Sequence, residues 1–70
     1  MKVAIVNSQS GVRKDFDSVF WLKRYCSSRP FWSGSLLRVW QVYRLSSDGK
    51  LMPYRFGIKS LYDFISHYNV

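Results

Sequence analysis

The sequence predicts an α+β protein: a single ββαββα domain over all 70 residues, with two helices packed on one face of a four-stranded, mainly antiparallel sheet. Three observations predict this fold. Asp48 and Gly49 lie between two strand-like segments, two other segments have apolar residues at helical spacing, and the order strand, strand, helix occurs twice. The pattern divides the chain into a first ββα unit at residues 1–28, an aromatic loop at 29–35 and a second ββα unit at 36–70.

The first unit begins with a short hairpin. Residues 2–6 are mostly apolar and β-branched, and residues 12–16 alternate in polarity. Between them, residues 7–11 are Asn, Ser, Gln, Ser and Gly, which form turns readily. The two stretches are therefore predicted to pair as strands.

A helix is predicted to follow this hairpin. Asp17 is expected as its N-cap, and Phe16 is expected to pack against Trp21 as a hydrophobic staple. The helix should end near residues 27–28, because Pro30 disfavours helical geometry in the residue before it. Its apolar stripe consists of Val19, Leu22, Tyr25 and Cys26.

A longer hairpin is predicted for residues 36–58, with Asp48 and Gly49 at the centre of a two-residue type I′ turn. This register pairs Ser47 with Lys50, Leu45 with Met52, Tyr43 with Tyr54 and Gln41 with Phe56. The side predicted to face the core carries Leu37, Val39, Tyr43, Leu45, Met52, Tyr54 and Phe56. The outward side carries Arg38, Trp40, Val42, Arg44, Pro53 and Arg55. Both strands agree on the apolar side, and a one-residue slip would reverse one of them.

The second unit is predicted to end in a helix. Ser60 and Asp63 have the spacing of a capping box, in which each side chain accepts a hydrogen bond from the other residue's backbone. The apolar positions that follow are Leu61, Phe64, Ile65 and Tyr68. Their spacing predicts an amphipathic helix that covers the sheet.

The charge of the chain is strongly unbalanced. Eleven Lys and Arg residues stand against four Asp and no Glu, which gives a formal net charge of +7. Such a charge attracts polyanions and acidic proteins. A charge of this size would also serve solubility alone. The basic residues interleave with aromatic ones, however, which favours an anionic partner.

The sequence carries no motif of an enzyme or a metalloprotein. A lone cysteine, Cys26, and a lone histidine, His67, make neither an internal disulfide nor a zinc site, so no cofactor or metal is expected. Cys26 is expected to be a buried apolar residue, and Asp63 with His67 a surface ion pair. No segment has the length of a membrane span or a signal-peptide core, so an intracellular, cytoplasmic location without membrane contact is expected.

Two surfaces are candidates for binding. The outward side of the long hairpin offers Arg38, Trp40, Arg44 and Arg55. Arginines bridge phosphates or carboxylates and a tryptophan stacks on a base or a side chain, although such residues are also common on solvent-facing strands. The aromatic loop offers Arg29, Phe31 and Trp32. These loop residues either fold back into the core or form a hot spot for a protein partner.

Two functions remain open for a protein without an active site. The favoured one is a modulator or inhibitor that docks on an acidic or nucleic-acid-binding surface of a larger nucleic-acid-processing complex, such as a nuclease, a CRISPR effector or a polymerase. The alternative is direct DNA or RNA binding through the basic-aromatic sheet face. In size and aromatic content the chain is similar in kind to phage and mobile-element accessory proteins that disarm host enzymes, a similarity that no motif carries. The sequence also leaves a homodimer open.

Overall fold

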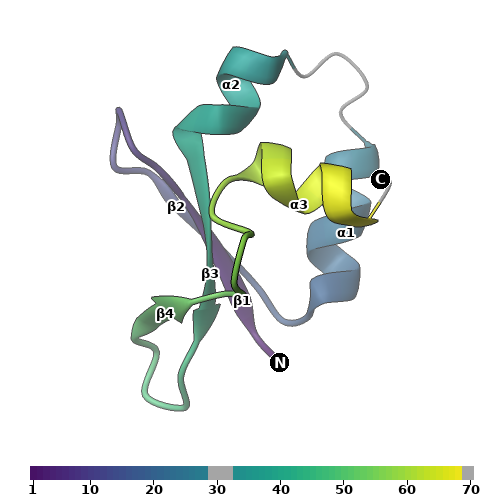
Figure 1. Ribbon diagram of the computed structural model, residues 1–70. Helices are drawn as coiled ribbons and strands as arrows, with labels where there is room; N and C mark the ends of the chain where they lie inside the picture. Colours follow the sequence, from purple (N-terminus) through teal and green to yellow (C-terminus); the bar gives the residue numbers. More distant parts are fainter. Residues whose placement is uncertain (29–32, 69–70) are drawn as a thin grey trace.

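The computed structural model describes residues 1–28 and 33–68. Its elements are β1 (Val3–Asn7), β2 (Arg13–Phe16), α1 (Val19–Ser27), α2 (Gly34–Val39), β3 (Trp40–Leu45), β4 (Leu51–Pro53) and α3 (Leu61–Tyr68). The strands form one antiparallel sheet in the order β2-β1-β3-β4. The predicted α+β class is confirmed, and the short helix α2 is an addition to the predicted order (Figure 1).

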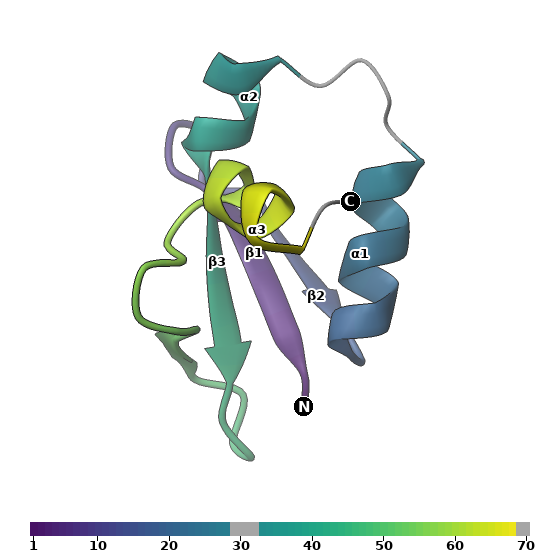
Figure 2. The ribbon, with the colours of Figure 1, turned by 45° about the vertical axis from the view of Figure 1, so that its right-hand side comes forward.

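The core lies between the sheet and the two longer helices. Figure 2 shows α1 and α3 on the same side of the sheet, with α2 leading directly into the start of β3. The buried apolar side chains that meet there come from every helix, from β1 and β3, and from the segment before α3. They are Val3 and Ile5 of β1, Leu22 and Cys26 of α1, Leu37 of α2, Trp40 and Val42 of β3, Leu61 and Phe64 of α3, and Tyr54 and Ile58 from the segment before α3. Burial of these side chains is the main favourable term that holds the helices on the sheet.

The first hairpin forms as predicted. Val3 pairs with Phe16 and Val6 with Arg13. The turn is closed by the side chain of Asn7, whose Oδ1 accepts hydrogen bonds from the backbone amides of Gln9 and Ser10.

The start of α1 differs from the prediction, while its end agrees. Ser18, rather than Asp17, is the N-cap residue, and its side chain makes no capping hydrogen bond. The ring of Phe16 packs against Tyr25, at 5.4 Å between centroids, and the predicted staple partner Trp21 is half-exposed. Phe16 is the last residue of β2, and its side chain packs against the hydrophobic core. Its ring therefore lies beside the part of α1 that faces the core.

Residues 36–39, predicted as the beginning of a strand, are helical. The hydroxyl of Ser33 accepts a hydrogen bond from the amide of Leu36 at 3.2 Å and caps α2. The helix buries Leu37 and ends at Val39, so the strand begins only at Trp40. A short apolar stretch fits either structure, and here the local serine cap accompanies the helix.

The register of the second hairpin is one residue away from the predicted one. Leu45 pairs with Leu51 instead of Met52. The amide of Ser46 donates to the Lys50 carbonyl and the amide of Gly49 donates to the Ser46 carbonyl, both at 3.0 Å. The loop therefore has three residues, with Gly49 at a φ of 83° that favours glycine, in place of the predicted two-residue turn.

The core side of β3 is also the reverse of the predicted side. Trp40 and Val42 are 8% and 2% exposed, whereas Tyr43 and Leu45 lie half-buried on the other face of the sheet. The reason is the pairing with β1, in which Ile5 lies opposite Val42 and both point into the core. Sheet faces are set by the central strand, and the hairpin pattern alone does not contain this information.

Between β4 and α3 the chain leaves the sheet and then returns to it. The strand β4 ends at Pro53, and Gln41 of β3 next pairs with Ser60 as an isolated bridge. The intervening residues 54–59, here called the return loop, are anchored by the buried side chains of Tyr54 and Ile58. Phe56, predicted to lie in the core, is fully exposed in this loop. Across residues 1–28 and 33–68, no helix combines the length and apolar character that crossing a membrane requires.

Candidate functional site

The residues predicted to share one outward face are dispersed. Trp40 is buried, so its predicted outward position is wrong. Arg44 is exposed, and its Nε donates to the Pro53 carbonyl at 3.1 Å. Arg38 belongs to α2 and Arg55 to the return loop, on different elements from Arg44. The predicted loop residues Arg29, Phe31 and Trp32 lie outside the described residues.

Cations from three elements meet on two tyrosines of α3. The guanidinium of Arg38, at the end of α2, lies 4.3 Å from the ring centroid of Tyr62. Lys23 of α1 places its Nζ 4.2 Å from the ring centroid of Tyr68. Arg55 of the return loop donates from Nη1 to the Tyr68 hydroxyl at 3.3 Å. Ring contacts of this kind attract a cation without neutralising its charge.

The start of α3 fixes the position of these tyrosines. The amide of Asp63 donates to the Ser60 hydroxyl at 3.3 Å, and the Asp63 carboxylate accepts from the amides of Lys59 and Ser60, both at 3.2 Å. These backbone hydrogen bonds lower the pKa of Asp63. The predicted capping box is confirmed, and below it Leu61 and Phe64 are completely buried.

The end of α3 is tied to the return loop. The hydroxyl groups of Tyr54 and Tyr68 lie 2.8 Å apart in a hydrogen bond. Burial raises the pKa of Tyr54, and its bond to Tyr68 raises the pKa further. The pKa of Tyr68 is lowered by the hydrogen bond with Tyr54, and then by the hydrogen bond and charge of Arg55 and the charge of Lys23. The lowered pKa of Tyr68 therefore comes first from the hydrogen bond with Tyr54, and the nearby positive charges of Arg55 and Lys23 add to it.

The tip of the return loop presents a large apolar side chain to solvent. The amide of Ile58 donates to the Arg55 carbonyl at 3.1 Å, which closes a tight turn around Phe56 and Gly57. Gly57 has a φ of 86°, a conformation that few other residues adopt readily. Beside this turn lies an open groove of about 670 Å³, whose walls come from β3, the end of β4 and the return loop.

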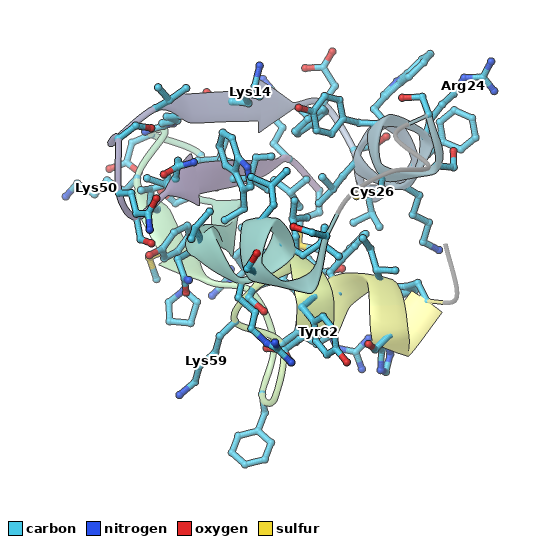
Figure 3. All side chains as sticks on the ribbon, turned by 90° about the horizontal axis from the view of Figure 1, so that it is seen from above. Lys14, Arg24, Cys26, Lys50, Lys59 and Tyr62 are labelled. Carbon is cyan, nitrogen blue, oxygen red and sulfur yellow. The ribbon has the colours of Figure 1, made fainter. Side chains whose placement is uncertain are left out.

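These residues lie on α3 or on the parts of the chain that contact it, and together they are here called the basic-aromatic surface. It consists of Lys23, Arg38, Arg55, Phe56, Lys59, Tyr62 and Tyr68. Within residues 1–28 and 33–68 the ion pairs are Arg13 with Asp15 and Lys50 with Asp48, so no cation of this surface belongs to an ion pair there. Figure 3 shows Lys59 and Tyr62 on one side of the molecule, with Lys14 and Arg24 on the opposite side.

Sequence reasoning found Arg38 and Arg55 but missed the rest of this surface. The contacts of Lys23 with Tyr68, and of Arg38 with Tyr62, join distant parts of the chain, and no local pattern signals them. A signal for the exposed Phe56 was present, because a glycine inside a predicted strand often marks a bulge. Gly57 occupies that position.

Three sequence expectations concern side chains that could take part in chemistry. Cys26 is buried as predicted, and burial raises the pKa of its thiol to about 11, so it is protonated near neutral pH. The predicted ion pair between Asp63 and His67 is wrong, because neither ion pair of the described chain involves these residues. No group of three His, Cys, Asp or Glu side chains comes together in the described ranges to hold a metal.

Comparisons with known proteins do not add an assignment. No family model, no curated protein and no solved structure matches this chain.

Proposed function

We propose that this protein is a non-enzymatic modulator that docks through its basic-aromatic surface on an acidic or nucleic-acid-binding surface of a larger nucleic-acid-processing complex. One observation carries the proposal. Cations from α1, α2 and the return loop are held on the tyrosines of α3, and none of them is in an ion pair within residues 1–28 and 33–68. The protein thus holds a group of positive charges in place for an external acidic partner.

The tyrosine contacts favour binding by restraining the cations in advance. A free lysine or arginine side chain loses about 1.5–2 kcal/mol of conformational freedom when it is fixed. Lys23 and Arg38 already lie against rings in the unbound protein, so less of this cost remains when a carboxylate approaches. The remaining positive potential raises the association rate with an acidic surface.

Exposed aromatic residues favour a protein over a nucleic acid as the partner. A sheet that reads single-stranded nucleic acid stacks bases on open ring faces. Here Trp40 is buried, and one ring face of Tyr62 and of Tyr68 is occupied by a cation. Phe56 instead projects from a tight turn, as an anchor residue does when it inserts into a pocket of a protein partner.

Direct DNA or RNA binding is the second candidate function. The same cations of the basic-aromatic surface would contact phosphates, and the number of contacts would appear as a steep fall of affinity with salt. Docking on a protein predicts a milder salt dependence, because part of its free energy comes from buried apolar area.

The test compares two double variants that remove equal charge, one at the cations held on the tyrosines of α3 and one at cations that contact neither of these tyrosines. Lys23→Gln with Arg38→Gln alters the basic-aromatic surface, and Lys14→Gln with Arg24→Gln is the matched control. Each double variant removes two positive charges from the net charge of +7. The tagged proteins are used for capture from a nuclease-treated cell lysate, and the captured partner is then titrated at several salt concentrations.

We expect the first double variant to lose about fivefold or more in affinity for the captured protein, and the control to change about twofold or less. Equal effects of the two variants would contradict the assignment of the surface. Binding to bare DNA or RNA with a steep salt slope, together with no nuclease-resistant partner, would replace the proposal by the second candidate.

A further inference from the structure

We infer that the groove beside the return loop receives a large apolar side chain from an extended, acidic segment of the protein partner, and that Phe56 packs against the same segment. This inference rests on the proposed function and specifies the chemistry that the partner must present. It gives a role in binding to the apolar groove, which the cation contacts with Tyr62 and Tyr68 do not involve.

The groove has the size and lining of an apolar subsite. Its volume of about 670 Å³ falls in the range of sites that hold small ligands or side chains. β3 forms one wall, where Tyr43 is half-buried and Val42 points into the core. Pro53 lies at the end of β4, and the buried residues Tyr54 and Ile58 line the side toward the return loop. One large apolar side chain fits such a space and would be removed from water there.

The turn that carries Phe56 is fixed before a partner arrives. Tyr54 and Ile58 are buried on either side of it, and the bond from the Ile58 amide to the Arg55 carbonyl closes it. The hydroxyl of Tyr54 is also bonded to that of Tyr68 on α3. An exposed phenylalanine on a restrained turn loses little conformational freedom on binding, which is the property of a binding anchor.

The charges at the rim indicate an acidic segment. Arg55 and Lys59 both line the groove, and the described residues that line it include no acidic one. Neither cation belongs to an ion pair in the described part of the chain. In an extended peptide, alternate side chains lie about 6.6–6.8 Å apart. In such a peptide, the residues two positions before and two positions after an apolar residue point to the same side as that residue. Carboxylates at these two positions could therefore reach the two cations while the apolar residue enters the groove.

The probes are two acetylated and amidated heptapeptides of alternating Glu and Asp, one with a central Leu and the other with a central Ser. Binding to the full chain is followed by amide chemical shifts at constant ionic strength. We expect the Leu peptide to bind about tenfold more tightly than the Ser peptide, because only leucine gains from leaving water. The largest shifts should fall on residues 41–43 and on the return loop. Equal affinities, or largest shifts elsewhere, would overturn the inference.

Phe56→Ala tests the anchor, and Phe20→Ala is the matched control. Both phenylalanines are exposed, so each variant should keep the fold, and Phe20 lies on α1, away from the groove. We expect Phe56→Ala to weaken binding of the Leu peptide about fivefold or more, and Phe20→Ala to change it about twofold or less. Equal binding by Phe56→Ala and the unmodified protein would overturn the role of the anchor.

The outcomes separate this inference from the proposed function. Capture of a protein that depends on Lys23 and Arg38 but not on Phe56, with no preference for the Leu peptide, would overturn the inference and leave the proposed function standing. A third probe is indole, a neutral apolar molecule. If indole shifts the groove amides as strongly as the Leu peptide does, the groove is a site for small apolar ligands and the inference is wrong.

Discussion

The two helices that cover the sheet are held in different ways. The helix α1 is held by its buried side chains Leu22 and Cys26, and its N-cap side chain makes no hydrogen bond. Its last turn is closed locally, by the hydroxyls of Ser27 and Ser28 bonded to carbonyls three residues earlier. The helix α3 is capped at its start by Ser60 and Asp63, and its end is bonded to the return loop through Tyr68.

The helix α1 mainly covers the core, whereas α3 covers the core and also holds cations from other parts of the chain on its tyrosines. The outer side of α1 carries Phe20 and Trp21, whose rings pack against each other at 5.1 Å. The tyrosines of α3 instead contact cations from three other parts of the chain. Fixed geometry at α3 is what the proposed docking function requires, so disturbing the attachment of α3 should have larger effects than the matched change at α1.

The largest expected effect on stability comes from truncating an aromatic side chain that a helix buries, compared with one that a helix exposes. Phe64 of α3 is completely buried, whereas Trp21 of α1 is 52% exposed. We expect Phe64→Ala to reduce the free energy of unfolding by about 3–5 kcal/mol, from lost burial and the cavity left behind. Trp21→Ala should cost less than about 1 kcal/mol. Urea unfolding followed by far-ultraviolet circular dichroism measures both.

A loss of this size in a small domain can leave no folded protein to measure. Phe64→Leu is therefore the second variant, with an expected cost of about 1.5 kcal/mol. If Trp21→Ala proves as costly as Phe64→Leu, α1 contributes more through its outer side than its exposure indicates, and the contrast between the helices fails.

The next effect concerns the bond between α3 and the return loop. Tyr54→Phe removes one hydroxyl of the pair with Tyr68, and we expect a loss of about 1 kcal/mol in the free energy of unfolding. Tyr62→Phe is the control, because its ring stays under Arg38 and its hydroxyl has no hydrogen bond within the described ranges. A double-mutant cycle of Tyr54→Phe and Tyr68→Phe that gives no coupling would show that the bond does not hold the helix.

The same contrast shows which parts of the fold a sequence can predict. The turn of the first hairpin and the cap of α3 were predicted correctly, because residues within three positions of each other form both of them. The second hairpin was predicted with a one-residue error, since an Asp-Gly pair fits both two-residue and three-residue loops. The core side of β3 was reversed, because β1, more than thirty residues earlier in the chain, determines it.

The candidate site was less predictable than the fold for the same physical reason. Arg38 and Arg55 were selected because they shared a predicted face, yet in the structure Arg38 contacts Tyr62 and Arg55 contacts Tyr68, two different tyrosines of α3. Contacts between side chains distant in sequence depend on the completed packing of the helices on the sheet. The spacing of residues along the sequence does not predict these contacts.

The caps of the two helices provide the third prediction. Ser60→Ala removes the acceptor for the Asp63 amide, and we expect a loss of about 1 kcal/mol in the free energy of unfolding. Ser18→Ala removes a side chain that makes no capping bond at α1, so a change of only a few tenths of a kcal/mol is expected. Thermal and urea unfolding of both variants give the comparison, and equal losses would contradict the difference between the two helix starts.

The smallest expected effect on stability comes from the negative charge of Asp63, which is lost when its carboxylate is protonated at low pH. Hydrogen bonds from the backbone amides of Lys59 and Ser60 lower its pKa below the ordinary 3.8. The folded protein therefore binds this proton less readily than the unfolded chain, and the stabilisation is present above pH 4 and lost as pH falls through the lowered pKa. Asp63→Asn should cost about 0.5 kcal/mol at pH 7, and the difference from the unmodified protein should shrink steadily as the pH falls below 4. A difference that stays constant over this range would show that shape, and not charge, supports the start of α3.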